Sequence, residues 1–220
     1  MSSKEKKKRR VTNKKKIIIC LVIVLLVIGG YFAYNNIFKK EETKAPKVVD
    51  EIKKFNYVVN EKDSKLFKNL FKDLKKDLSE KEVDNKKYAE DIAKLFVVDF
   101  FTLDNKSSKN DIGGVQFVYS SYKADFVDFA RDGIYKQVNN SIDSNNNQNL
   151  PEVTSVEVTK VDEVVPSSIF EHKDFENEKE ANAYEITVEW KYKNGTGFQD
   201  KATLTIVKDK DKLSVAKMEE

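Results

Sequence analysis

A run of uncharged, mostly apolar residues near the N-terminus constrains this chain more than any other feature. The segment IIICLVIVLLVIGGYFAY occupies residues 17–34, and the uncharged run continues to Phe38. A helix of about 20 such residues crosses the hydrocarbon core of a bilayer. The run exceeds the roughly 7–15 apolar residues of a signal-peptide core, and no small-x-small cleavage site follows it. We therefore expect residues 17–38 to form a transmembrane helix in contact with membrane lipid, with a cleaved signal peptide as the less favoured alternative.

The charges on either side of this run predict its orientation. Nine of the 40 basic residues lie in residues 1–16, and none lies in residues 17–38. Because basic residues beside a membrane span favour the cytoplasmic side, residues 1–16 are predicted to be a cytoplasmic tail of a cell-membrane protein. The C-terminal part then lies outside. There the other 31 basic residues face 36 acidic ones, since Glu5 alone precedes the span, and this excess of acid argues against a nucleic-acid partner.

The outer part is predicted to consist of a polar tether, residues 39–46, and one domain, residues 47–220. The only cysteine, Cys20, lies inside the span, so the domain has no disulfides, which secreted domains often use. The composition is rich in Lys and Asn, and Arg131 is the only arginine beyond the span. This composition is typical of a Gram-positive-type bacterium.

The first half of the domain has the apolar spacing of helices, and four are predicted, at residues 48–59, 64–78, 84–103 and 121–134. In the first, apolar residues recur at spacings of three and four: Val48, Val49, Ile52, Phe55 and Val59. Ser64 is predicted to cap the second helix.

The fourth helix is predicted to bury one apolar face. That face consists of Tyr122, Phe126, Phe129, Ala130, Gly133 and Ile134. A polar linker, NNSIDSNNNQNLP, follows it and contributes little to a core.

After Pro151 the apolar period changes from 3.6 to two, which predicts strands. Strands are expected in EVTSVEVTKVDEVV, with a bulge between Val153 and Val156, and in AYEITVEWKYK, QDKATLTIVK and LSVAKM. Asn194–Gly195 suits a tight turn, and residues 166–182 are predicted to be a loop from which Phe170 and Phe175 pack onto the domain. The sequence therefore predicts an α+β domain in which helices cover one face of an antiparallel sheet.

This layout carries a resemblance to a known superfamily. The segment YEITVEWKYKNGTGFQDKATLTIVKDKDKLSVAKM, preceded by helices and a membrane anchor, resembles the nuclear transport factor 2-like (cone-shaped α+β) superfamily. The layout is similar to that of membrane-anchored assembly subunits of conjugation and type IV secretion machines, although a cystatin-like sheet has the same pattern. The resemblance implies a curved sheet and a role in protein assembly, and it transfers no functional residue.

Asp99 interrupts the apolar face of the predicted third helix, in the sequence LFVVDFF. At about 100° per residue, Asp99 lies near the centre of the face formed by Tyr88, Ile92, Leu95 and Leu103. An unpaired buried carboxylate is costly. Asp99 is therefore either a member of a satisfied structural network or a catalytic group with a shifted pKa.

The chain offers three kinds of partner for Asp99. They are the backbone N–H groups of the glycine-bearing loop SKNDIGG, a tyrosine hydroxyl, and the Arg131 guanidinium, which binds carboxylates bidentately. We predict a structural polar network of Asp99, Arg131, Asp111, Gly113 and Gly114 that locks the third helix to the following loop.

The inventory of reactive side chains beyond the span is small. It contains one histidine, His172, and no cysteine, so it offers neither the His or Cys pair of a zinc site nor a cysteine nucleophile. The segment DSNNNQN lacks the glycine and the final glutamate of a calcium loop. We expect no metal, no cofactor and no catalysis, and an enzyme that uses Asp99 is the least favoured hypothesis.

These features together predict a non-enzymatic, single-pass membrane protein. Its extracytoplasmic domain is expected to bind protein partners, or further copies of itself, in a bacterial cell-envelope assembly of the conjugation or secretion kind. The alternative is an extracytoplasmic domain that binds a small apolar ligand inside its cone.

Overall fold

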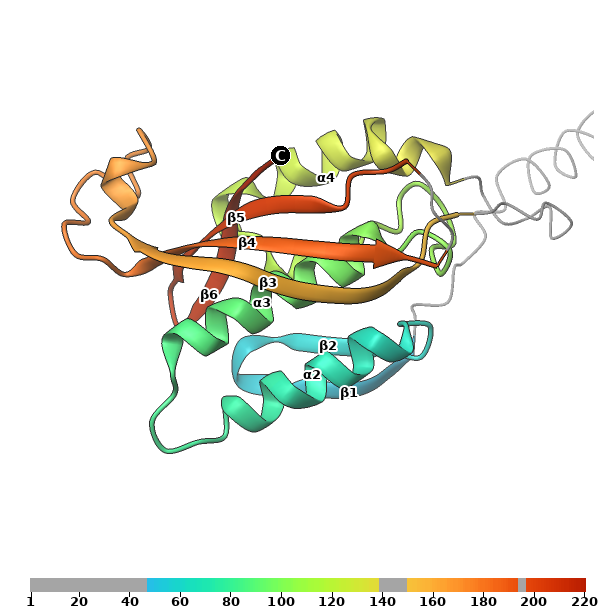
Figure 1. The fold of residues 1–220 in the computed structure, drawn as a ribbon, viewed down its shortest axis with the longest axis horizontal. Coiled ribbons are helices and arrows are strands. Elements are labelled where there is room, and N and C mark those ends of the chain that lie inside the picture. The colour runs from blue at the N-terminus through green and yellow to red at the C-terminus, as the bar shows by residue number, and fades with distance from the viewer. Residues whose placement is uncertain (1–46, 139–149, 194–196) are drawn as a thin grey trace, which may run out of the picture. The chain divides into compact units, whose positions relative to one another are not determined.

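Three α-helices pack against a curved, antiparallel four-stranded sheet (Figure 1). The computed structural model describes residues 47–138, 150–193 and 197–220. These residues belong to one compact unit, Pro46–Glu220. The predicted α+β class is therefore confirmed.

Part of what the sequence predicts lies outside the described residues. The basic tail, the membrane span and the tether fall in residues 1–46, the polar linker falls largely in residues 139–149, and the Asn194–Gly195 turn falls in residues 194–196. None of the described helices combines the length and the hydropathy that a bilayer crossing requires.

The sheet has the strand order β3-β4-β5-β6, with every pair antiparallel. Its strands are β3 (Val153–Val164), β4 (Ala183–Tyr192), β5 (Lys201–Asp209) and β6 (Lys212–Glu219). The strands follow one another in both sequence and space, so the sheet is a meander, as the run of alternating segments predicts.

Alternating burial in β4 confirms the period of two. Ile186, Val188 and Trp190 are buried, whereas Glu189 and Lys191 between and beyond them are exposed. The predicted bulge in β3 is also present, because the register between β3 and β4 shifts between Val153 and Ser155, and again between Val158 and Lys160. Such bulges bend the strand and increase its local twist.

The helix α3 (Asn85–Phe101) forms the centre of the domain. Eleven of its 17 residues are buried, and it contacts all four strands of the sheet. Asp84 begins it by accepting hydrogen bonds from the backbone N–H groups of Lys86 and Lys87. Such a helix, apolar on most sides, is stable only as the middle layer of a core.

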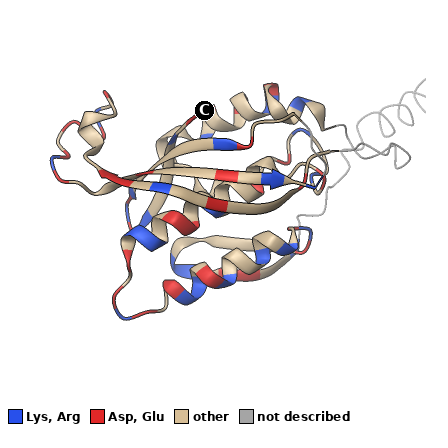
Figure 2. Cartoon of the chain, in the orientation of Figure 1, with Lys and Arg blue, Asp and Glu red and all other residues tan. Residues whose placement is uncertain are grey.

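The helix α2 (Lys65–Asp77) packs beside α3. As predicted, the Ser64 side chain caps it by accepting a hydrogen bond from the Phe67 N–H. Phe67, Phe71 and Leu74 form its buried stripe, and its outer face carries lysines and acids (Figure 2). The apolar and polar faces therefore divide as the 3.6-residue period requires.

The prediction of a helix at residues 48–59 is wrong. This segment forms a hairpin of β1 (Val48–Ile52) and β2 (Tyr57–Asn60), joined by the 3₁₀ turn Lys53–Phe55. Asn56, with a φ of 54°, adopts the left-handed conformation that reverses the chain. Apolar spacings of three and four arise here by chance, because Tyr57 and Val59 point inward at a spacing of two and β-branched valines favour strands.

The fourth helix, α4 (Lys123–Asp132), is shorter than predicted, and the expected burial of Phe129 is wrong. Ala130 is buried and Phe126 packs partly against the core, but the Phe129 side chain is 75% exposed. Positions 126 and 130 stack as an i, i+4 row on the packed side, and Phe129 lies beside that row.

The loop that joins β3 to β4 packs as predicted. Phe175 is buried against Ala183 and Val207, and the Phe170 ring lies 4.7 Å from the Phe175 ring. One short 3₁₀ turn, Pro166–Ser168, occurs in this loop. The other described 3₁₀ turns are Val115–Phe117, Ser120–Tyr122 and Ile134–Gln137.

Candidate functional site

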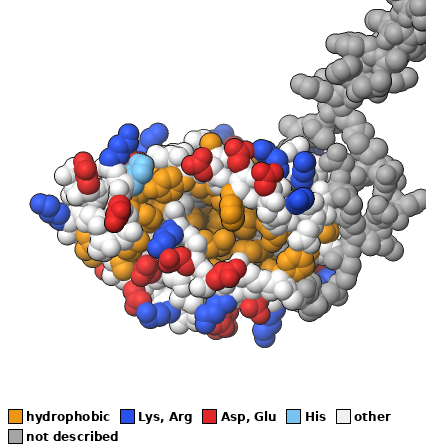
Figure 3. Space-filling model, turned by 90° about the horizontal axis from the view of Figure 1, so that it is seen from above, with side chains coloured by type: hydrophobic (Ala, Val, Ile, Leu, Met, Phe, Trp, Pro, Cys, Tyr) orange, Lys and Arg blue, Asp and Glu red, His pale blue; other side chains and the backbone are white. Residues whose placement is uncertain are grey.

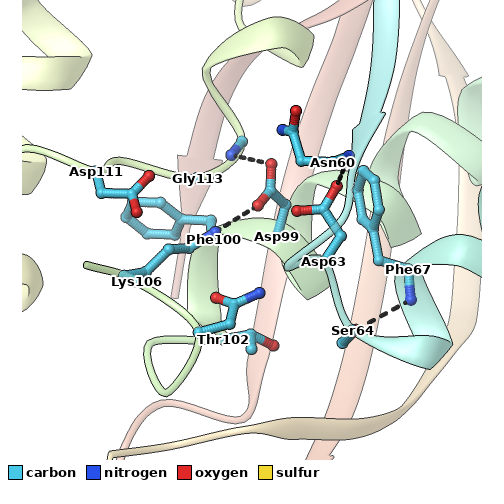
Figure 4. Close-up of polar contacts among 12 residues, drawn as sticks. Asn60, Asp63, Ser64, Phe67, Asp99, Phe100, Thr102, Lys106, Asp111 and Gly113 are labelled. Atoms are coloured by element: carbon cyan, nitrogen blue, oxygen red, sulfur yellow. Dashed lines mark hydrogen bonds and ion pairs between the residues drawn. The ribbon is translucent and has the colours of Figure 1, made fainter. Parts of the chain in front are cut away.

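Asp99 is enclosed between α3 and the loop that follows it (Figure 4). The Lys106 ammonium donates to Asp99 Oδ1 at 2.7 Å, and the Gly114 N–H donates to Oδ2 at 2.7 Å. The side chains of Lys106 and Asp99 are 6% and 14% exposed. Both carboxylate oxygens therefore have a charged or backbone donor, and the carboxylate ties the loop to the helix.

Two glycines allow the loop to approach α3 this closely. A Cβ at Gly113 would lie 2.1 Å from the Asp99 carbonyl oxygen, and Gly114 has a φ of +78°, so neither position accepts a larger residue without displacement. The Gly113 N–H donates to the Tyr135 hydroxyl at 2.8 Å, and that hydroxyl donates to the Phe100 carbonyl at 2.9 Å.

Asp111 supports the same loop without contacting Asp99. One of its oxygens accepts from both the N–H and the hydroxyl of Ser107, each at 2.9 Å. Burial disfavours the Lys106 ammonium, but the negative charge of Asp99 and then Asp111 outweighs it, so the pKa of Lys106 is raised. Lys106 is thus held as a buried cation.

Four of the five residues of the predicted network lie together, namely Asp99, Asp111, Gly113 and Gly114. Arg131 does not join them, because its guanidinium pairs with Asp128 one turn away on α4, at 2.7 Å. Lys106 takes the place that the sequence analysis gave to Arg131. The only sequence signal for Lys106 is that a lysine lies in the loop that follows the helix of Asp99, and Lys109 fits it as well.

Two neighbouring carboxyl groups, Asp77 of α2 and the buried Asp91 of α3, lie where these helices meet. The Asp91 carboxyl lies beside that of Asp77, and Oδ2 of each is buried without a hydrogen-bond partner in the described residues. Burial raises the pKa of Asp91 to about 6, and the neighbouring Asp77 carboxyl adds to that rise. Lys94 and Lys87 flank the pair at 3.3 Å and 2.8 Å.

An apolar groove lies between α4 and the edge strand β6, and we call it the α4–β6 groove. Its volume is about 320 Å³. Phe96 and Phe100 of α3 form part of its lining, together with Phe126 and Phe129 of α4 and residues 215–218 of β6. Hydrophobic side chains gather in a hollow on this face of the molecule, with acidic and basic ones around it (Figure 3).

The groove runs beside an unpaired strand edge. In the strand order β6 is last, and Val118 forms an isolated parallel bridge to Val215, with the Tyr119 N–H donating to the Val215 carbonyl at 2.8 Å. Within the described residues no strand pairs with the outer edge of β6 beyond that bridge. The sequence analysis missed this site, because it assigned Phe129 to the core and could not show which strand is at the edge.

The α4–β6 groove and the Asp99 network are separate features. Asp99 does not line the groove. Among the described residues no group of three or more His, Cys, Asp or Glu side chains is arranged to hold a metal ion. The arrangement at the groove suits binding by apolar contact and backbone hydrogen bonds, whereas Asp99 suits the locking of a loop.

Comparisons with known proteins give no relative on which to base a function. Neither the protein-family models, nor the curated proteins, nor the solved structures yield a match to this chain.

Proposed function

We propose that residues 47–220 are the extracytoplasmic binding domain of a non-enzymatic, single-pass membrane protein that takes part in a bacterial cell-envelope assembly. The apolar run at residues 17–38 and the basic tail before it support the anchor. The helices packed against a curved meander suit the resemblance to nuclear transport factor 2-like assembly subunits. We assign no catalytic role to Asp99, because Lys106 and Gly114 occupy its two oxygens.

The observation that carries this proposal is the apolar lining of the α4–β6 groove, which includes the exposed Phe129 side chain. Phe129 leaves 75% of its surface in water and is the most exposed of the large hydrophobic side chains in the described part of the chain. Phe100 and Phe126 lie beside it in the lining, with ring centroids 5.2 Å apart. Such a patch, next to a cleft, is typical of a surface that a partner covers.

The occupant that fits best is an extended, apolar segment of another protein. A segment of this kind adds to a free sheet edge by main-chain hydrogen bonds and places alternate side chains in neighbouring pockets. The edge of Ala216–Met218 offers the hydrogen bonds, and the aromatic lining offers the pockets. Asp125 and Lys217 also line the groove, so the lining offers one charged group of each sign beside its apolar rings.

Photo-crosslinking of the full chain in its own membrane tests the proposal. A photoreactive phenylalanine analogue at position 129 is compared with one at position 83, because Val83 is also an exposed hydrophobic residue but lies outside the groove. We expect position 129, and not position 83, to crosslink to an apolar, extended segment of one other protein. A peptide of that segment should then bind the full chain about tenfold more weakly after Phe129→Ser, as expected when a buried aromatic contact is lost.

The crosslinked species also decides between occupants. Lipid, a second copy of this chain, or the chain's own residues as the only product at position 129 would each contradict a separate protein partner. A small apolar ligand is the second candidate, since about 320 Å³ lies at the lower end of the range of small-molecule sites. Native mass spectrometry of the purified full chain would detect it as a bound mass that Phe129→Ser removes.

A further inference from the structure

A second cavity lies away from the α4–β6 groove, where two hairpin tips meet the start of α4. Its volume is about 260 Å³. One wall comes from the turn between β1 and β2, another from the turn between β5 and β6, and a third from residues 120 and 123. Four lysines line it, and we call it the lysine pocket: Lys54, Lys123, Lys210 and Lys212.

The four lysines have no carboxylate partner. In the described part of the chain none of them makes an ion pair within 4.0 Å, although ion pairs form elsewhere on the surface. Like charges brought together without a counterion repel one another at a cost. The lysines of this cavity are therefore short of negative charge.

The two acidic residues of the lysine pocket do not neutralise its four lysines. The Asp209 side chain is already engaged by neutral donors, because its oxygens accept from the Ser120 N–H at 3.0 Å, the Ser120 hydroxyl at 2.9 Å and the Ser214 hydroxyl at 3.4 Å. Asp209 is buried, and it fixes the start of the helical segment that leads into α4. Asp211 is exposed at the tip of the turn. With four lysines against two acids, the cavity keeps a net positive charge.

Lys212 is the lysine held most firmly in place. Its ammonium donates to the Gln116 carbonyl at 3.1 Å and lies 5.0 Å from the centre of the Tyr57 ring. Burial, and then the nearby charge of Lys123, lowers the pKa of Lys212. The side chain is thus ordered by neutral groups, and the nearby charge of Asp209 only partly offsets the effects of burial and of Lys123.

The backbone of the lysine pocket is also unusual. Asn56 and Lys210 are the only described non-glycine residues with a positive φ, at 54° and 60°, and both line this cavity. Asp209 pairs with Lys212 across a two-residue turn, and the first central position of such turns favours Gly or Asn. A lysine there is strained, and strained residues concentrate at functional sites. The turn places a charge where glycine would be more stable.

We propose that the lysine pocket binds a phosphate-bearing anion. Lysine ammonium groups bind phosphate as point charges, and a phosphate group with about two negative charges would neutralise the excess of two positive charges. The same chemistry is offered by a soluble phosphate compound and by the headgroup of an anionic phospholipid. The inference does not depend on the α4–β6 groove, because the two sites share no lining residue.

Lysine footprinting on the full chain in nanodiscs distinguishes these sources. The reactivity of each lysine toward an acylating reagent is measured by mass spectrometry in phosphatidylcholine discs, with and without pyrophosphate at constant ionic strength, and in discs that contain phosphatidylglycerol. We expect protection of Lys123, Lys210 and Lys212 with no change at Lys191, an exposed lysine on β4. Protection by pyrophosphate identifies a soluble ligand, and protection by phosphatidylglycerol alone identifies a headgroup. Equal reactivity in all three samples overturns the proposal.

Two variants separate binding from folding. Lys210→Gly should raise the melting temperature, since glycine accepts the positive φ. It should also raise, about tenfold, the ligand concentration that gives half-maximal protection of Lys123 and Lys212, as expected for one lost charge-assisted hydrogen bond. Lys191→Gln is the control and should change neither. If Lys210→Gly raises the melting temperature but leaves the protection unchanged, Lys210 serves only the turn and the lysine pocket is not the binding site.

Discussion

Replacing Asp99 by asparagine tests whether this residue is the structural lock that its contacts indicate. The carboxylate serves two donors, the Lys106 ammonium and the Gly114 N–H, each at 2.7 Å. An asparagine has one acceptor oxygen, so its NH₂ group must face one of these donors. The change also removes the only carboxylate that pairs with the buried Lys106 ammonium in the described residues.

The expected loss of stability is large for a single isosteric change. Removing one partner of a buried ion pair costs about 3–5 kcal/mol, because it leaves an uncompensated charge. A domain has only about 5–15 kcal/mol of unfolding free energy. At 2–4 °C per kcal/mol for a domain of 150–250 residues, the melting temperature should fall by roughly 6–20 °C.

Denaturant titration of the full chain in detergent, followed by tryptophan fluorescence, measures this loss. Asp128→Asn is the matched control, because Asp128 is also paired with a cation but is 70% exposed, and surface pairs contribute about 0–1 kcal/mol. The double variant Asp99→Leu with Lys106→Met should recover much of the loss, since an apolar pair leaves no buried charge. A loss below about 1 kcal/mol for Asp99→Asn would refute the reasoning, since it lies within the range of an exposed pair.

Three further predictions concern the same helical layer. Gly113→Ala should destabilise the domain by more than about 2 kcal/mol, since its Cβ would lie 2.1 Å from the Asp99 carbonyl oxygen, and urea titration measures it. Asp91→Asn should stabilise the domain at pH 7. The raised pKa of Asp91, about 6, means that the folded state binds this proton more tightly than the unfolded state, whose pKa is about 3.9. The contribution of Asp91 to stability therefore falls as the pH rises from about 4 to about 6, and melting temperatures across that window should be flatter in the variant. Ser64→Ala should cost about 1 kcal/mol by removing the cap of α2, and it should leave that pH dependence unchanged.

The secondary structure could be predicted wherever one apolar period, of 3.6 or of two residues, runs through a long segment. In β4 strict alternation allows no other reading, and in α2 the apolar stripe and the Ser64 cap agree. Residues 48–59 fit both periods, because a hairpin with apolar residues at each end also yields spacings of three and four. The left-handed conformation of Asn56 makes this segment a hairpin. Asparagine adopts that conformation more often than most residues, but not often enough for its presence to predict a turn.

Of the Asp99 network, only the contribution of Asp99 and the two glycines could be predicted from the sequence. Helical spacing places Asp99 on the inner face of its helix, and the two glycines indicate a backbone that approaches another element closely. Both signals can be recognised in the sequence. Lys106 is the partner because the loop returns along α3, and no pattern in the sequence specifies that path. Arg131 was predicted as a partner of Asp99 because it is the only arginine beyond the span. It pairs instead with Asp128, which lies one turn away on the same helix.

The edge strand β6 explains why both proposed sites lie where they do. Lys212 at its start faces the lysine pocket, Leu213 and Val215 pack into the core, and residues 215–218 line the α4–β6 groove. The register with β5 shifts between Thr205 and Ile206, so β6 carries one extra residue and bends away from its neighbour. Val118 bridges the strand at Val215 alone. The start of β6 therefore borders a cavity lined by lysines, and its second half borders a groove lined by apolar rings, so one edge strand serves both proposed sites.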